Sequence, residues 1–173
     1  MIRAAVILAC HNGAPYLREQ IASVFGQVDC CVHVYYSDDG STDQSLNICK
    51  NMCGDEFNLN IENKKFGSAA ANFFHASASF SNSGEYDIIL FCDQDDIWLP
   101  NKISRAYEVL QQGFDVYSGS FWAFFEGCSD LSYVDKSFHQ KKFSFFVRGA
   151  GPGFTFAFSP HAFKILQISI SRL

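Results

Sequence analysis

The sequence predicts an α/β fold in which helices cover both faces of a mostly parallel β-sheet. Over the first hundred residues, short apolar runs alternate with segments of helical periodicity. Strands and helices in strict alternation imply right-handed crossover connections and parallel strands buried on both sides. The chain has 173 residues, 48% of them hydrophobic, which is enough for an ordinary core. We expect one domain over residues 1–173, with a first half at 1–112 and a second half at 113–173.

The first half contains four expected strands and four expected helices. Strands are expected at 2–9, 32–37, 59–62 and 87–92, where the apolar runs are short. Pro15 suits the first turn of the first helix, Ser41 or Thr42 suits a cap of the second, and Pro100 opens the fourth. The inner faces of the helices are expected to be Leu17, Ile21, Val24 and Phe25; Leu46, Cys49 and Cys53; Ala70, Phe73, Phe74 and Ser77; and Ile103, Ala106, Tyr107 and Leu110.

After Gln112 the alternation ends in an aromatic, glycine-punctuated region. We expect antiparallel or irregular strands near 116–117 and 121–125 to complete the sheet, and a short helix from about Pro160. The chain has 19 phenylalanines, which become denser after Phe114. This aromatic half can form core, a partner surface or the wall of a groove.

The net charge of −5 is unevenly distributed. Residues 136–173 carry six basic side chains and no acidic one, which leaves −11 on the first 135 residues. A nucleic-acid binder would show a basic face across its main fold, so nucleic acid is not an expected partner. An anionic membrane surface, and hence peripheral membrane association, suits the basic segment as well as a diphosphate does.

The cysteines and the hydropathy indicate a cytoplasmic protein. None of the seven cysteines forms a pair with zinc-knuckle or redox spacing, and most fit core positions, as expected in a reducing compartment. The apolar run that follows Arg3 is too short for a signal peptide. No stretch approaches the ~20 apolar residues of a membrane span.

Polar clusters follow three of the expected strands, at residues 10–12, 38–41 and 93–96, and the ends of parallel strands are where ligands bind. The third cluster holds three carboxylates, Asp93, Asp95 and Asp96, within four residues. On an extended chain Asp93 and Asp95 share one face and Gln94 takes the other. Hard oxygen ligands suit Mg²⁺ or Mn²⁺ together with substrate phosphates, so we expect a metal and phosphate site. The alternative is a solvated acidic turn that caps the next helix.

Five ordered motifs make the chain resemble glycosyltransferase family 2, and within it the bacterial enzymes of rhamnosyltransferase type. The motifs are His11-Asn12-Gly13, Leu17-Arg18-Glu19-Gln20-Ile21, Ser37-Asp38-Asp39-Gly40-Ser41-Thr42-Asp43, Asn72-Phe73, and the run from Phe91-Cys92-Asp93 to Lys102-Ile103. The resemblance covers about residues 2–160. It implies the GT-A fold, a Rossmann-like arrangement in which 1–112 is a nucleotide-binding half and 113–173 an incomplete acceptor-side half.

The resemblance also implies an activity. Its members move a sugar from a nucleoside-diphosphate donor, here UDP- or dTDP-linked, to a glycan or lipid-linked acceptor in cell-surface polysaccharide synthesis. The reaction would be inverting and would depend on Mg²⁺ or Mn²⁺. The expected location is the cytoplasm, at the inner face of the cell membrane. The alternative is a non-catalytic module that binds a nucleotide or docks a partner.

By the same resemblance, one group of residues binds the nucleotide. Ala9, His11 and Asn12 would line the base and ribose pocket, although His11 could instead cap the following helix. Asp39 would accept a hydrogen bond from the base. Residues 38–41 also suit an ordinary turn, which Asp38 and Ser41 would fix. Asn72 and Lys65 would contact base or phosphate, although by residue type alone Asn72 also suits a helix start and Lys65 a solvated surface.

A second group would serve the phosphates. Asp95 matches the metal-binding acid of the family, with Asp93 close by and Gln94 near the ribose. Asp96 and Trp98 would support the site through helix capping and wall packing, and Arg148 could reach a phosphate.

The general base of an inverting enzyme has no counterpart in the sequence. Gly153-Phe154-Thr155 looks like the landmark that precedes this carboxylate in the family, but the last acid of the chain is Asp135. The spacing of His139 and His161 does not indicate catalysis. We therefore expect a truncated chain that binds nucleotide and transfers little or no sugar.

Overall fold

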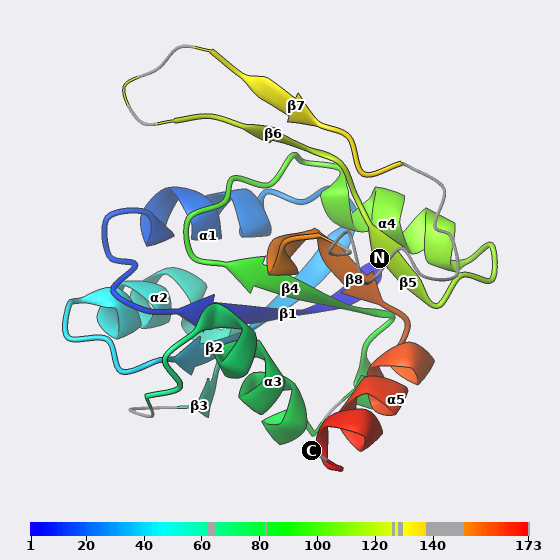
Figure 1. Cartoon of the computed structure of the whole chain (residues 1–173), viewed down its shortest axis with the longest axis horizontal. Helices are drawn as coiled ribbons and strands as arrows, with labels where there is room; N and C mark the ends of the chain where they lie inside the picture. Colours follow the sequence, from blue (N-terminus) through cyan, green and yellow to red (C-terminus); the bar gives the residue numbers. More distant parts are fainter. Residues whose placement is uncertain (62–64, 82, 126, 128–129, 138–150, 173) are drawn as a thin grey trace.

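The computed structural model describes residues 1–61, 65–81, 83–125, 127, 130–137 and 151–172. Its centre is a six-stranded sheet in the order β3-β2-β1-β4-β8-β5 (Figure 1). The strands are β1 (Ile2–Cys10), β2 (Cys30–Asp38), β3 (Phe57–Ile61), β4 (Ile88–Asp93), β5 (Val116–Ser118) and β8 (Phe156–Phe158). The pairs β1–β2, β1–β4 and β2–β3 are parallel, and β8 runs antiparallel to β4 and β5. The predicted mostly parallel sheet is confirmed, and the first four strands lie within two residues of their expected bounds.

Helices cover both faces of this sheet, as Figure 1 shows for α1 and α4 on one side and α3 and α5 on the other. One apolar cluster takes its helical residues from α1 (Leu17–Phe25), α2 (Ser45–Cys53) and α4 (Lys102–Leu110). The other takes them from α3 (Ala69–Ser79) and α5 (Pro160–Ile170). Among the described residues, short 3₁₀ turns lie at Gly54–Glu56, Ser83–Glu85 and Gly153–Thr155.

The central strand β1 is buried along most of its length because both faces of the sheet are covered. Ala4, Val6 and Leu8 point into the first cluster, whereas Ala5 and Ile7 point into the second. None of these five side chains is more than 1% exposed. Burial of this kind is the main stabilising contribution to such a fold, at about 25 cal/mol per Å² of apolar surface.

The second half differs from its expected arrangement. The segment expected at 121–125 does not join the main sheet: β6 (Phe121–Ala123) pairs with β7 (Ser132–Val134) in a separate hairpin that projects past α1 and α4 in Figure 1. The place beside β4 belongs to β8, which the sequence analysis missed. The helix expected from about Pro160 is α5.

Several helix starts and faces also differ from expectation. Helix α2 begins at Ser45 after Gln44, so neither Ser41 nor Thr42 caps it. Phe25 and Phe74 are exposed, at 38% and 45%, and Ala70 is exposed as well, so these three residues are not part of the inner faces.

The fourth helix differs in the same way. It begins at Lys102 after Asn101, two residues beyond Pro100. Within the described part of the chain, no helix has the length and apolarity needed to cross a membrane.

Candidate functional site

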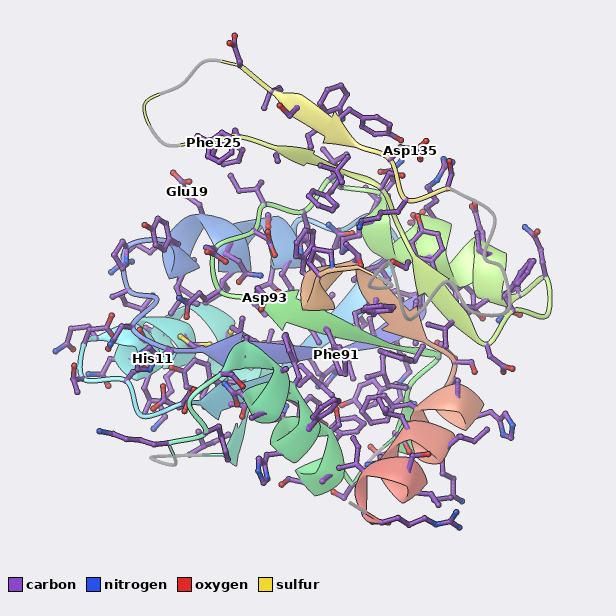
Figure 2. All side chains as sticks on the ribbon, viewed as in Figure 1. His11, Glu19, Phe91, Asp93, Phe125 and Asp135 are labelled. Atoms are coloured by element: carbon purple, nitrogen blue, oxygen red, sulfur yellow. The ribbon has the colours of Figure 1, made fainter. Side chains whose placement is uncertain are left out.

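The strand order brings the three predicted polar clusters to one edge of the sheet. Strand β1 lies between β2 and β4, and Ala9 is in register with Ser37 on one side and with Asp93 on the other. Because the three strands are parallel, the loops that follow them leave at the same edge. Figure 2 shows His11 and Asp93 at the ends of β1 and β4.

The loop after β1 is tied to the loop after β2 through Asn12. Asn12 has a left-handed backbone, with φ of 51°, and its N–H donates to Ser41 Oγ at 2.9 Å. Its side-chain Oδ1 accepts from the N–H of Thr42 at 2.9 Å. Asp38 fixes the second loop, as expected, because its Oδ2 accepts from the N–H of Ser41 at 2.9 Å. The side chain of Asn12 therefore braces the two loops.

His11 joins all three loops. Its N–H donates to Gln94 Oε1 at 2.6 Å, and its Nδ1 lies 2.8 Å from the carbonyl oxygen of Asp39. A carbonyl can only accept, so Nδ1 carries the proton, and Nε2 of the exposed ring accepts from Asn12 Nδ2 at 3.3 Å. The residue before α1 is Tyr16, so His11 does not cap that helix.

The Asp39 carboxylate is 8% exposed and already holds backbone donors. Its Oδ1 accepts from the N–H groups of Phe66 and Gly67, and its Oδ2 accepts from the N–H of Gly67 at 3.1 Å. A carboxylate has about four acceptor positions, so one on Oδ2 remains for another donor.

Asn72 and Ala9 lie beneath the site rather than on its surface. Asn72 is 2% exposed, and its amide donates to the carbonyl of Ser37 at 3.2 Å and accepts from the hydroxyl of Ser37 at 2.5 Å. Ala9 is 5% exposed. Asn72 therefore ties α3 to the end of β2. The side chain of Lys65, the other residue expected near base or phosphate, is exposed.

Residues 93–96, called the acidic turn, do not form the extended segment that was expected. Strand β4 ends at Asp93, and a turn follows. Asp95 is exposed, whereas Asp93 and Asp96 are half-buried. Asp93 Oδ2 accepts from the N–H of Phe154 at 3.2 Å. Asp96 Oδ2 is buried and has no hydrogen-bond partner among the described residues. The N-cap of α4 is Asn101, so this turn does not cap the helix.

Burial changes the acidity of two of these carboxyls. Desolvation, with a smaller contribution from the charge of Asp95, raises the pKa of Asp93 to about 6. Desolvation and the charges of Asp93 and Asp95 raise the pKa of Asp96 to about 7. Both effects arise from crowding negative charge where water is partly excluded.

The side chain of Gln94 links two of the loops. Because its Oε1 accepts from the N–H of His11, it holds the acidic turn against the first loop. There is no room for a larger residue at Gly13, since a Cβ there would lie 2.9 Å from Gln94 Oε1 and 3.0 Å from Cys10 Sγ. The close approach of the two loops therefore requires glycine.

The acidic turn suits a divalent cation, although the described residues contain no group of three or more His, Cys, Asp or Glu side chains arranged around a metal position. Such a group is not required where a nucleotide is bound, because Mg²⁺ and related ions commonly take one or two carboxylates, waters and substrate phosphates. The exposed Asp95 and the half-buried Asp93 offer carboxylate oxygens, and the unpartnered Asp96 Oδ2 adds to the negative charge around them. Asp95 and Asp93 are the residues that could hold the cation.

The site contains a lysine that the sequence analysis did not single out. The ammonium of Lys102 donates to the carbonyl of Phe154 at 3.0 Å and lies 4.8 Å from the centre of the Trp98 ring. Burial lowers the pKa of Lys102. The four-residue spacing of Trp98 and Lys102 was visible in the sequence, but the partner Phe154 lies 52 residues away.

The remaining candidates do not complete a catalytic group. Asp135 is exposed at the foot of the β6–β7 hairpin, well separated from Asp93 in Figure 2, and its Oδ1 accepts from the N–H of Ser137 at 2.8 Å. His161 is exposed on α5. His139 and Arg148 lie outside the described residues.

Comparison with known proteins identifies the family. The model of "Glycosyl transferase family 2" matches residues 5–171. The chain belongs to this family. The resemblance inferred from the five motifs is therefore confirmed.

Two curated relatives show how this family member compares in sequence. The chain is 36% identical to dTDP-rhamnosyl transferase RfbG of Shigella flexneri, over 86% of this chain and 52% of the relative. It is 31% identical to an uncharacterized glycosyltransferase of Nostoc, over 64% of this chain and 33% of the relative. The chain thus spans about half, or less, of the length of these relatives.

Solved structures confirm the GT-A fold. Residues 1–349 of TarS from S. aureus match with a TM-score of 0.71 at 17% identity, covering 95% of this chain and 49% of that one. The mannosyltransferase PcManGT from Pyrobaculum calidifontis, in complex with GDP-Man and Mn²⁺, matches with a TM-score of 0.61 at 17% identity, covering 91% of this chain and 44% of that one.

Proposed function

We propose that this chain is the donor-binding part of a metal-dependent, inverting glycosyltransferase that uses a UDP- or dTDP-linked sugar. The observation that supports this most is the meeting of Asp39 and the acidic turn at one edge of the sheet, on either side of the end of β1. A nucleoside diphosphate needs two kinds of group, polar contacts for its base and ribose and a cation for its phosphates. This edge offers polar groups for the base and ribose, and carboxylates that would hold the cation.

In this proposal the first and second loops hold the nucleoside. The free acceptor position on Asp39 Oδ2 would take the ring N–H of uracil or thymine, and the exposed ring of His11 would lie against the ribose. Asn12 would complete the pocket wall, with Ala9 beneath it. Gln94 and Asn72 would act by fixing the loops and strand ends around it, since their amides are hydrogen-bonded within the protein.

Asp95, with Asp93, would hold Mg²⁺ or Mn²⁺ beside the diphosphate. When bound, such an ion supplies Lewis-acid stabilisation of the negative charge that develops on the leaving group. The two carboxylates would fix the position of the phosphates relative to the base pocket. Asp96 would add negative charge beneath them without direct contact.

The relatives support a class of donor. The name of RfbG, a dTDP-rhamnosyl transferase, favours a deoxyhexose donor. TarS was crystallised with UDP-GlcNAc. We propose a glycan or lipid-linked acceptor in cell-surface polysaccharide synthesis, met by residues 113–173. Because no acid follows Asp135 in the sequence, we expect this chain to bind donor and to hydrolyse it slowly, with little transfer to an acceptor.

A thermal-shift panel tests the proposal. UDP, dTDP and GDP are each added with and without Mn²⁺, and UDP or dTDP with Mn²⁺ is expected to raise the melting temperature by roughly 5–10 °C at saturating ligand. Release of free diphosphate from the matching donor sugar would separate an enzyme from a non-catalytic nucleotide-binding module. The absence of any shift with all three nucleotides would contradict the proposal.

A further inference from the structure

The side chain of Lys102 reaches from the start of α4 to the turn that precedes β8. Its Nζ donates to the carbonyl of Phe154 at 3.0 Å, with the Trp98 ring 4.8 Å away. It also attracts the charge of Asp96. One ammonium therefore connects the acidic turn, α4 and the turn at residues 151–155.

The backbone of Phe154 is held on both sides of its Cα, through the two peptide groups that flank it. Its carbonyl accepts from Lys102, while its N–H donates to Asp93 Oδ2 at 3.2 Å. The turn at residues 151–155 is hydrogen-bonded and closely packed. Thr155 donates its N–H to the carbonyl of Pro152 at 3.1 Å, and a Cβ on Gly153 would lie 2.6 Å from the ring of Phe73. The orientation of the Asp93 carboxylate is thus linked to the position of Lys102.

The charges at this place are matched to a divalent cation. Asp93, Asp95 and Asp96 carry three negative charges when ionised, and Lys102 carries one positive charge. The remainder of two negative charges is what a divalent ion would neutralise. The unpartnered Asp96 Oδ2 is compensated by the lysine through space, which leaves Asp93 and Asp95 available as ligands.

We propose that Lys102 is a positioning residue for the metal and diphosphate site, because it fixes the Phe154 peptide that orients Asp93 and balances the charge of Asp96. This rests on the proposed function. A buried ammonium with few hydrogen bonds costs folding free energy, so stability alone does not account for a lysine at this position. Removing its charge should therefore affect metal-dependent binding and stability in different ways.

The test compares Lys102→Met and Lys102→Arg with wild type, and uses Lys164→Met on the exposed surface of α5 as the matched control. The first readout is hydrogen exchange of the Phe154 amide in the ligand-free protein. The second is calorimetric titration with UDP and with dTDP, each with and without Mn²⁺. The third is the melting temperature, which reports whether each variant is folded.

Lys102→Met is expected to exchange the Phe154 amide about tenfold faster and to bind the nucleotide with Mn²⁺ about tenfold more weakly, at an equal or higher melting temperature. Lys102→Arg keeps the charge and N–H donors and should lose less affinity. The control should match wild type. Unchanged exchange of the Phe154 amide in Lys102→Met would overturn the proposal, and so would unchanged affinity.

The two proposals fail in different ways. If wild type binds neither nucleotide with Mn²⁺, the proposed function fails, while the exchange rate of the Phe154 amide still decides whether Lys102 fixes that peptide. If wild type binds and Lys102→Met binds equally well, the role of Lys102 fails and the proposed function stands.

Discussion

Asp95 and Asp96 are neighbours in the chain, but the fold gives their carboxylates different surroundings. Asp95 is exposed, whereas one oxygen of Asp96 is buried with no hydrogen-bond partner in the part of the chain that the structure describes. The sequence predicted an acidic site but not the difference between the two carboxylates, because residues 93–95 were expected to be extended. The turn that begins after Asp93 separates an accessible ligand from a buried charge.

Asp95→Asn should weaken metal-dependent nucleotide binding without affecting the fold. Asp95 is exposed, so the melting temperature should change little. Loss of a charged ligand should lower the affinity for UDP or dTDP with Mn²⁺ by roughly tenfold or more, as measured by calorimetry. Asp55→Asn, at an exposed acid outside the site, is the matched control. Equal affinity in Asp95→Asn and wild type would exclude Asp95 as a ligand.

Asp96→Asn should stabilise the protein at high pH more than at low pH. The pKa of Asp96 is raised to about 7 in the folded protein, so the folded state favours the protonated carboxyl. Its stabilising contribution is fully present below the unfolded pKa near 4 and is lost as the pH rises through about 7.

The amide mimics the protonated acid, so we expect a gain of about 1 kcal/mol at pH 8, or about 2–4 °C in melting temperature, and much less at pH 5. Thermal unfolding of both proteins at the two pH values measures the difference. The same gain at both pH values would show that ionisation of Asp96 is not the cause.

At the scale of elements, the parallel strands were predictable and the short antiparallel ones were not. Strand β1 is an apolar run buried on both faces, a pattern typical of parallel sheets. Strand β8 has only three residues and follows a glycine- and proline-containing turn, so its aromatic run does not distinguish strand from loop. Its place beside β4 depends on pairing with residues far away in the chain.

Gly13→Ala should test whether contact between two loops shapes the site. The new Cβ would crowd Gln94 and Cys10, so the hydrogen bond from His11 to Gln94 should be lost. Overpacking of this kind costs about 1–3 kcal/mol, which thermal unfolding would detect, and nucleotide affinity should fall as well. Gly84→Ala is the control, because a Cβ there has no neighbour within 4 Å. Equal effects of the two substitutions would contradict the proposed contact.

At the scale of the whole molecule, the strand order predicted at which edge of the sheet the site lies. It did not predict the contacts within the site. Alternating strands and helices place the ends of β1, β2 and β4 together, so the meeting of His11, Asp39 and Asp93 could be predicted from the sequence. The burial of Asn72 and the link from Lys102 to Phe154 depend on how separate segments pack. A single sequence does not contain those distances.

The most direct test is to locate bound Mn²⁺ by its paramagnetic broadening of backbone amide signals. The ¹⁵N-labelled chain would be compared in the presence of UDP or dTDP with Mn²⁺ and with Mg²⁺ as the diamagnetic reference. We predict broadening of the amides at residues 11–13 and 93–96, with those of α5 unaffected. Broadening centred on another part of the molecule, or none with either nucleotide, would contradict a metal and diphosphate site at this edge of the sheet.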